Sequence, residues 1–159
     1  MTYVITLIIQ FLVACVATAA FAVLFTSPKS EVVFCGIAGG IGWLVYYIFT
    51  LHNLSVVLAS VVGTFILAVL ARALAVIRRV PATVYLLTGI FPLVPGAGIY
   101  YTAYYLFTGQ NELFGAKGLE TFEVACAIVF GIIFGFAIPQ KLFQKLPRID
   151  KSKDDYVDK

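Results

Sequence analysis

One stretch decides how this sequence folds: Phe91-Pro92-Leu93-Val94-Pro95-Gly96-Ala97-Gly98-Ile99-Tyr100. Two prolines and two glycines in seven positions break a helix, and the flanking residues are strongly apolar. A proline lacks the N–H that bonds the carbonyl four residues earlier, so Pro92 frees the carbonyl of Thr88. Pro95 likewise frees that of Phe91. Within a membrane such groups are tolerated only where protein, water or a ligand satisfies them.

The composition places the chain in a lipid bilayer. Its 159 residues are 62% hydrophobic and 12% charged, with a mean hydropathy of +1.01, whereas soluble domains are about 45–50% apolar and about 25% charged. No Asp, Glu, Lys or Arg occurs in the forty residues between Glu31 and Arg72, or from Val80 to Asn111. We therefore predict an all-α, polytopic integral membrane protein.

The apolar segments predict five membrane-spanning helices, because a bilayer core of about 30 Å needs about 20 residues of helix. The five segments are Tyr3–Phe25, Val32–Leu51, Leu54–Ala71, Val84–Phe107 and Phe122–Gln140. The fourth contains the Pro/Gly break and the fifth is short. His52-Asn53 predicts a tight hairpin turn, with Asn53 or Ser55 capping the third helix. Four spans plus a re-entrant Val32–Leu51 is the alternative. Residues 1–140 thus form the membrane domain.

Charge sets the expected orientation, because Lys and Arg in short loops stay in the cytoplasm. Five spans from an external N-terminus place Lys29, the arginines that follow the third span and the basic tail 141–159 in the cytoplasm. The external side receives His52-Asn53 and a loop, Thr108–Thr121. We expect a multi-pass protein of the cell membrane. The basic tail is a topology signal and indicates no nucleic-acid partner.

Little in the sequence favours an enzyme. The three cysteines lie in apolar runs without metal-ligand spacing, and we find no hydrolase, zinc-protease or nucleotide-binding motif, so we expect no metal and no cofactor. No carboxylate is expected deep in a span, although proton-driven carriers place one there. A proton site would then lie in a partner chain, at His52, or near Glu112, Glu120 and Glu123.

Small residues spaced by three predict close helix packing. The motifs are Gly36-x-x-x-Gly40, Ala38-x-x-x-Gly42 and Gly131-x-x-x-Gly135. Each puts two small residues on one helix face, where another backbone can approach. We expect a compact bundle.

The break predicts an anion site. A half-helix that begins after Pro95 leaves the N–H groups of Gly96, Ala97 and Gly98 unpaired, and a helix N-terminus attracts anions. Transporters use broken helices in this way to hold carboxylates. A hydroxyl-bearing face follows, formed by Tyr101, Tyr104, Tyr105 and Thr108 with Tyr100 beside it. An ordinary kinked helix with interfacial tyrosines is the alternative.

The candidate substrate-binding residues are Thr88, Pro92, Pro95, Gly96, Ala97, Gly98, Tyr100, Tyr101 and Tyr104. Arg72, His52 and Thr64 are candidates for a gating or charge role. Arg72 would neutralise an anionic substrate or extend to the lipid headgroups. For Thr64 and Thr88, bonding to the backbone of their own helix is the alternative.

Several motifs together resemble the small subunit of the threonine/serine exporter family. They are Val62-Gly63-Thr64, Arg72, Pro81, the run from Phe91 to Gly96 with Tyr100, and Gly135-Phe136-Ala137-Ile138-Pro139 before the basic tail. The most specific is Pro-x-x-Pro-Gly-x-x-x-Tyr. Where a relative has Ser after Pro-Gly-x, this chain has Gly98, which leaves the choice between amino acids and dicarboxylates open.

The resemblance implies export of threonine and serine from the cytoplasm, driven by the membrane potential or a proton gradient. Members are either one fused protein or two chains, and a chain of this length resembles the smaller partner of a larger membrane subunit. A homo-oligomer is the alternative assembly. The alternative functions are a dicarboxylate (succinate-type) exporter subunit, a non-transporting assembly subunit and a passive channel. In the exporter, a small carboxylate-bearing solute would bind at the break and pass by alternating access.

Overall fold

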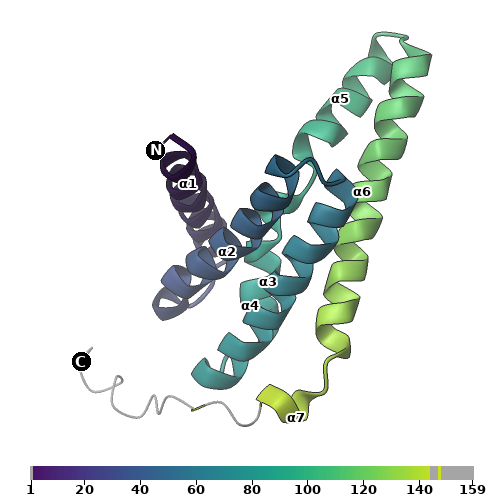
Figure 1. Ribbon diagram of the computed structural model, residues 1–159. Helices are drawn as coiled ribbons and strands as arrows, with labels where there is room; N and C mark the ends of the chain where they lie inside the picture. The colour runs from purple at the N-terminus through teal and green to yellow at the C-terminus, as the bar shows by residue number, and fades with distance from the viewer. Residues whose placement is uncertain (1, 144–146, 148–159) are drawn as a thin grey trace.

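The computed structural model describes residues 2–143 and 147 of the chain, apart from the side chain of residue 2. These residues form helices joined by short connections, without a strand (Figure 1). The all-α prediction is therefore confirmed. The elements are α1 (Thr2–Leu24), η1 (Lys29–Glu31), α2 (Val32–Leu51), α3 (Val56–Arg78), α4 (Ala82–Gly89), η2 (Phe91–Leu93), α5 (Gly96–Phe107), α6 (Asn111–Ala137) and α7 (Gln140–Phe143), where η marks a 3-10 turn.

Four helices are long and apolar enough to cross a membrane, and a bent pair adds a fifth segment. The four are Tyr3–Leu24, Lys29–Leu51, Val56–Arg78 and Asn111–Ala137. The pair is Ala82–Leu93 with Gly96–Phe107, whose axes differ by 52°. Helix α2 is continuous over 20 residues, so nothing in its backbone indicates a re-entrant loop. The predicted break in the fourth segment is confirmed.

The turn between α2 and α3 is as tight as the sequence predicts. Asn53 takes a left-handed conformation with φ of 57°, which a short polar side chain tolerates. Ser55 is the N-cap of α3, and its Oγ accepts a hydrogen bond from the Leu58 N–H at 3.2 Å. Of the two predicted caps, the structure selects Ser55.

Two predicted boundaries are wrong: the third segment, expected to end at Ala71, continues as α3 to Arg78, and the last segment, expected to start at Phe122, begins at Asn111. The expected external loop Thr108–Thr121 shrinks to a short connection around Gly109, whose φ of 72° ends α5. Helix α6 begins at Asn111 and runs for 27 residues, so the last membrane segment is the longest helix rather than a short one. A Lys117–Glu120 ion pair of 2.8 Å, three residues apart, supports its first half.

Glycines bring the helices into close contact, as predicted. A Cβ placed on Gly131 of α6 would lie 2.5 Å from the Val61 carbonyl oxygen of α3, and one on Gly135 would lie 2.5 Å from the Ala68 Cβ. Gly36 likewise faces the Cys15 carbonyl of α1 at 2.9 Å. Contacts that advance together along α3 and α6 mean that these two helices run parallel. This parallel pair makes the main helix–helix contact of the bundle.

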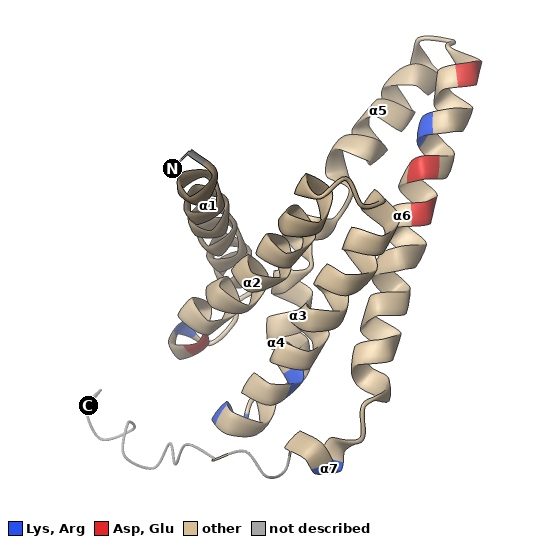
Figure 2. Ribbon diagram, in the orientation of Figure 1, with Lys and Arg blue, Asp and Glu red and all other residues tan. Residues whose placement is uncertain are grey.

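The hairpin of α5 and α6 extends beyond the α2–α3 turn (Figure 1). Figure 2 shows most of the described Lys and Arg residues near the opposite end of the bundle, whereas the first half of α6 carries three acidic residues and one lysine. We refer to the end with Lys29 and the arginines of α3 as the basic end. The positive-inside rule predicts that this end faces the cytoplasm. Most of the expected basic tail 141–159 lies outside the described residues.

Candidate functional site

The break between α4 and α5 retains more hydrogen bonds than the prolines alone suggest. After α4, the carbonyl of Ile90 accepts bonds from the Leu93 N–H at 2.9 Å and the Val94 N–H at 3.2 Å. The carbonyl of Phe91, which Pro95 was expected to free, accepts a bond from Val94 N–H at 3.3 Å. A 3-10 turn has thus replaced the missing α-helical bonds.

The N-terminus of α5 retains unpaired donors. The Gly96 N–H donates to the Val94 carbonyl, which leaves one fewer free amide than predicted. The amides of Ala97 and Gly98 have no hydrogen-bond acceptor within the described part of the chain. A Cβ on Gly96 would meet no atom within 4 Å, whereas one on Gly98 would lie 2.5 Å from Thr121 Oγ1 of α6. Open space therefore adjoins Gly96, and Gly98 lets α5 approach α6.

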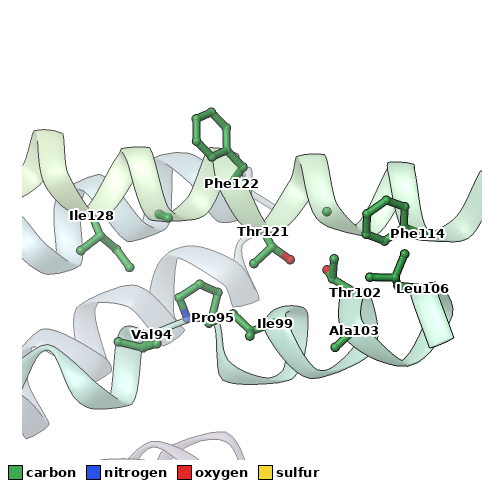
Figure 3. A pocket seen from close by; sticks show the side chains of 12 residues that line it. Val94, Pro95, Ile99, Thr102, Ala103, Leu106, Phe114, Thr121, Phe122 and Ile128 are labelled. Carbon is green, nitrogen blue, oxygen red and sulfur yellow. The ribbon is translucent and has the colours of Figure 1, made fainter.

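A pocket of about 630 Å³ lies beside the break, between α5 and α6 (Figure 3). Its lining is apolar apart from two hydroxyls, and both of these are occupied: Thr102 Oγ1 donates to the Gly98 carbonyl and Thr121 Oγ1 to the Lys117 carbonyl, each at 2.7 Å. None of the lining residues is charged. They are Val94, Pro95, Ile99, Thr102, Ala103, Leu106, Phe114, Gly118, Thr121, Phe122, Ala125 and Ile128.

The predicted tyrosines do not line this pocket. Ile99, Thr102, Ala103 and Leu106 form the face of α5 that does, and the tyrosines occupy other faces of the helix. Tyr100, Tyr101 and Tyr104 are 61%, 46% and 46% exposed. Their rings pack on one another along the helix, as in the stacked pair Tyr100–Tyr104, whose centroids are 6.4 Å apart. Of the predicted binding residues, only Pro95 lines the pocket.

The two candidate threonines bond the backbone of their own helices. Thr64 Oγ1 donates to the Ser60 carbonyl at 2.6 Å, and Thr88 Oγ1 to the Val84 carbonyl at 2.9 Å. Thr64 faces Gly131 at the contact between α3 and α6. Thr88 lines a different, smaller pocket of about 190 Å³, formed by α4 and the residues after α1: Phe25, Thr26, Ser27, Pro28, Thr83, Val84, Leu87 and Thr88. The structure thus separates Thr88 from the pocket at the break.

Arg72 binds the end of α6. Its Nη1 donates to the carbonyls of Gly135 at 2.8 Å, Phe136 at 3.1 Å and Ile138 at 2.7 Å. Its guanidinium carbon also lies 4.6 Å from the Phe143 ring centroid. These bonds satisfy carbonyls that a helix end leaves without partners. His52 is exposed in the α2–α3 turn, whereas Arg72 lies in the second half of α3.

A buried charged cluster at the basic end was not predicted. Glu31 is fully buried, although the sequence analysis placed no carboxylate within the bundle. Arg78 Nε donates to Glu31 Oε2 at 2.6 Å and Arg78 Nη2 to Oε1 at 3.1 Å. The hydroxyl of Tyr85, also fully buried, donates to Glu31 Oε2 at 2.6 Å. We call Glu31, Arg78 and Tyr85 the inner cluster.

The pairing of Glu31 with Arg78 could have been predicted from the sequence. The tight turn at His52-Asn53 makes α2 and α3 antiparallel, so the start of α2 and the end of α3 must meet at one end of the bundle. Glu31 and Arg78 occupy those two positions. We used Glu31 only to bound a stretch without charges, and Arg78 only to orient the spans. Tyr85, 54 residues from Glu31, carries no comparable signal.

Comparison with known proteins identifies the family. The family model described as Threonine/Serine exporter, ThrE matches residues 10–138. This range includes α2 to α6, the break and the inner cluster. No curated protein sequence and no solved structure matches the chain. Because the family model covers most of the chain, this membrane protein belongs to the threonine/serine exporter family.

Proposed function

We propose that this chain is a membrane subunit that exports small carboxylate-bearing metabolites, threonine and serine first, by alternating access around the break between α4 and α5. One observation carries the proposal: a helix pair long and apolar enough to span a membrane bends by 52° beside a pocket of about 630 Å³. Two short limbs joined at a 3-10 turn can change their angle without breaking a long helix. The direction of transport follows the family, and the N-terminus lies outside.

The bare amides of Ala97 and Gly98 support a carboxylate substrate. Neither has an acceptor among the described residues, and they open the N-terminus of α5, where backbone donors and the helix dipole favour negative charge. Open space beside Gly96 leaves room for a carboxylate to approach. Pro95 belongs both to this N-terminus and to the lining of the pocket, so the two adjoin.

The charge of the lining supports a second chain at the site. An amino-acid zwitterion brings an ammonium group, and a buried ammonium needs an anionic or hydrogen-bonding partner. None of the lining residues is acidic, and the two lining hydroxyls already donate to the backbone. A larger membrane subunit of the same family, or a second copy of this chain, would supply the missing group. A dicarboxylate of the succinate type would need a cation there instead.

The same apolar lining favours one alternative, a non-transporting assembly subunit whose pocket accommodates an apolar side chain of its partner. Co-expression with and without the larger subunit, followed by export of labelled threonine and labelled succinate, separates the two. An exporter subunit is required for flux and determines which solute moves. An assembly subunit would change only the amount of its partner in the membrane.

The direct test is the double variant Pro92→Ala/Pro95→Ala. Restoring both N–H groups allows a continuous helix, and we expect export of labelled threonine to be abolished while the protein still inserts in the membrane. Pro147→Ala, at an exposed position beyond α7, is the matched control and should export normally. Normal export by the double variant would refute the mechanism. Collapse of the gradient by an uncoupler should stop export, unless the chain is a passive channel.

A further inference from the structure

We propose that the inner cluster is the cytoplasmic gate of this exporter, a set of bonds that closes the basic end of the bundle and separates when solute enters. This inference rests on the alternating-access function proposed above and names the residues that would close its inner side. The pocket at the break is not part of the cluster, because none of Glu31, Arg78 and Tyr85 lines it. The cluster would therefore control access without holding the substrate.

Three separate elements meet in the inner cluster. Glu31 comes from η1 at the start of α2, Arg78 from the last residue of α3 and Tyr85 from α4. Both carboxylate oxygens of Glu31 are bonded, Oε2 to Arg78 and Tyr85, and Oε1 to Arg78 and to the Ser30 Oγ at 3.2 Å. Charge-assisted bonds of this kind are stronger than neutral ones. Three elements are thus joined at one carboxylate.

The cluster bonds α4, the short limb on the inner side of the break. Helix α4 has only eight residues, with the α3–α4 turn at one end and the 3-10 turn at the other. The Tyr85 bond to Glu31 holds α4 against the start of α2, and a weak Cys35 Sγ contact of 3.7 Å to the Val84 carbonyl lies on the same side. The 190 Å³ pocket is lined by Val84 and Pro28, next to these contacts. Movement of α4 away from α2 would widen that hollow.

Electrostatics makes the cluster suitable for a two-state gate. Removing one partner from a buried ion pair is costly, because the remaining charge stays unpaired in an apolar surrounding. Water satisfies both charges, however, and an ion pair exposed to water contributes little. The charges are therefore stable in two states: bonded to each other without water, or separated and each hydrated. Arrangements between these two states have a higher free energy. Arg78, whose side chain is 13% exposed, already lies at the edge of the solvent.

Other groups near the cluster also hold Glu31 and Arg78 in place, so a single substitution removes only part of the interactions. Ser30 donates to Glu31, and the Arg78 guanidinium carbon lies 4.0 Å from the Phe34 ring centroid, a cation–π contact. Removing the Tyr85 hydroxyl would leave the ion pair in place, whereas Glu31→Gln would remove it. Two variants of different strength are thus available, and neither creates a large cavity.

Cys35 provides a native reporter. Its side chain is fully buried and packs with Tyr85 between α2 and α4, so it should become accessible when α4 moves. Cys15→Ala and Cys126→Ala leave it as the single cysteine of the full-length chain. The experiment measures labelling of Cys35 by a membrane-impermeant charged maleimide in inverted vesicles. We expect Tyr85→Phe to raise the labelling rate about tenfold, since a bond to a charged group is lost, and Glu31→Gln to raise it further.

Arg79→Gln is the matched control, because Arg79 adjoins Arg78 and is exposed. Equal labelling rates in wild type, Tyr85→Phe and Glu31→Gln would overturn the gate. So would an equal acceleration in Arg79→Gln, since that indicates general loosening of this end. If Glu31→Gln fails to reach the membrane, Tyr85→Phe decides the outcome alone.

A second reporter separates the gate from the proposed function. Ala103 lines the pocket at the break, and Ala103→Cys in a cysteine-free chain can be labelled from the external side. Under alternating access, Tyr85→Phe should slow this labelling about tenfold as it opens the inner side. If Tyr85→Phe speeds Cys35 labelling but leaves Ala103→Cys labelling unchanged, the cluster still closes the basic end, and alternating access is refuted. An unchanged Cys35 rate refutes the gate whatever the result for export.

Discussion

The break between α4 and α5 and the inner cluster differ in almost every physical respect, although one short helix joins them. The break adjoins a large pocket whose lining carries no charge, and two of its backbone donors lack acceptors. The inner cluster has two charges and a phenol, all bonded, and Glu31 and Tyr85 are fully buried. One region offers space without charge, and the other offers charge with little space. We conclude that a binding role suits the first and a gating role the second.

The strongest test of this contrast is Arg78→Ala. It leaves Glu31 buried without its cationic partner, and we expect the free energy of unfolding in detergent to fall by about 3–5 kcal/mol. Arg79→Ala, one residue later and exposed, should change it by less than about 0.5 kcal/mol. Similar losses for the two variants would mean that the inner cluster contributes no more than an ordinary surface charge.

The contact between α3 and α6 joins the two regions, and Gly131→Ala tests it. The new methyl group would meet the Val61 carbonyl and the β-branched Thr64, so we expect a loss of about 1–3 kcal/mol in the free energy of unfolding. Gly115→Ala in the same helix meets no atom within 4 Å and should add up to about 1 kcal/mol. If Gly131→Ala lowers the free energy of unfolding and Gly115→Ala raises it, the close contact between α3 and α6 is supported. A change of the same sign in both variants would contradict it.

At the break itself, Gly98→Ala and Gly96→Ala form a matched pair. A Cβ at position 98 would force Thr121 away, which separates α5 from α6 and should cost about 1 kcal/mol of stability and lower threonine export. A Cβ at position 96 enters open space, so stability should hold, whereas export should fall because the methyl group fills room that the proposed carboxylate would use. Transport assays in whole cells, corrected for the amount of protein in the membrane, compare them. Equal stability of the two variants in detergent would contradict the close approach of α5 to α6, and unimpaired export by Gly96→Ala would contradict carboxylate binding at the break.

The smallest effect is expected for Tyr101→Phe. Tyr101 is half-exposed and lies outside the pocket lining, so loss of its hydroxyl should change stability by less than about 0.5 kcal/mol and leave export unchanged. The assay is again export of labelled threonine. A clear fall in export would place substrate on the tyrosine face of α5. The pocket between α5 and α6 would then no longer be the binding region.

Local sequence signals predicted much of the fold, because each depends on adjacent residues. The turn at His52-Asn53 with its Ser55 cap and the break after Phe91 follow from backbone chemistry within a few positions. The start of α6 was missed because the apolar run begins only at Phe122, after the charged residues Glu112, Lys117 and Glu120. In the structure these charged residues lie within α6, and Gly109 ends α5.

The sites were harder to predict, because they depend on side chains brought together from distant segments. The tyrosine stripe follows helical spacing correctly, yet spacing alone does not say which face of α5 packs on α6. The inner cluster joins Glu31 to residues 47 and 54 positions away. A single sequence reports charge at each position but no pairing between positions. Hence Arg78, which we had used only to orient the spans, is in the structure the partner of a buried carboxylate.

The Arg72 contact leaves a step at the basic end of the bundle. Its guanidinium binds the final carbonyls of α6, whereas α3 continues for six residues beyond Arg72 to its end at Arg78. At 1.5 Å per residue, α3 therefore extends about 9 Å past the level of Arg72. A recess of about 450 Å³ lined by Arg72, Pro81 and Gln140 lies beside this step. If the basic end faces the cytoplasm, as the positive-inside rule predicts, an exported solute would enter from the side on which this recess lies.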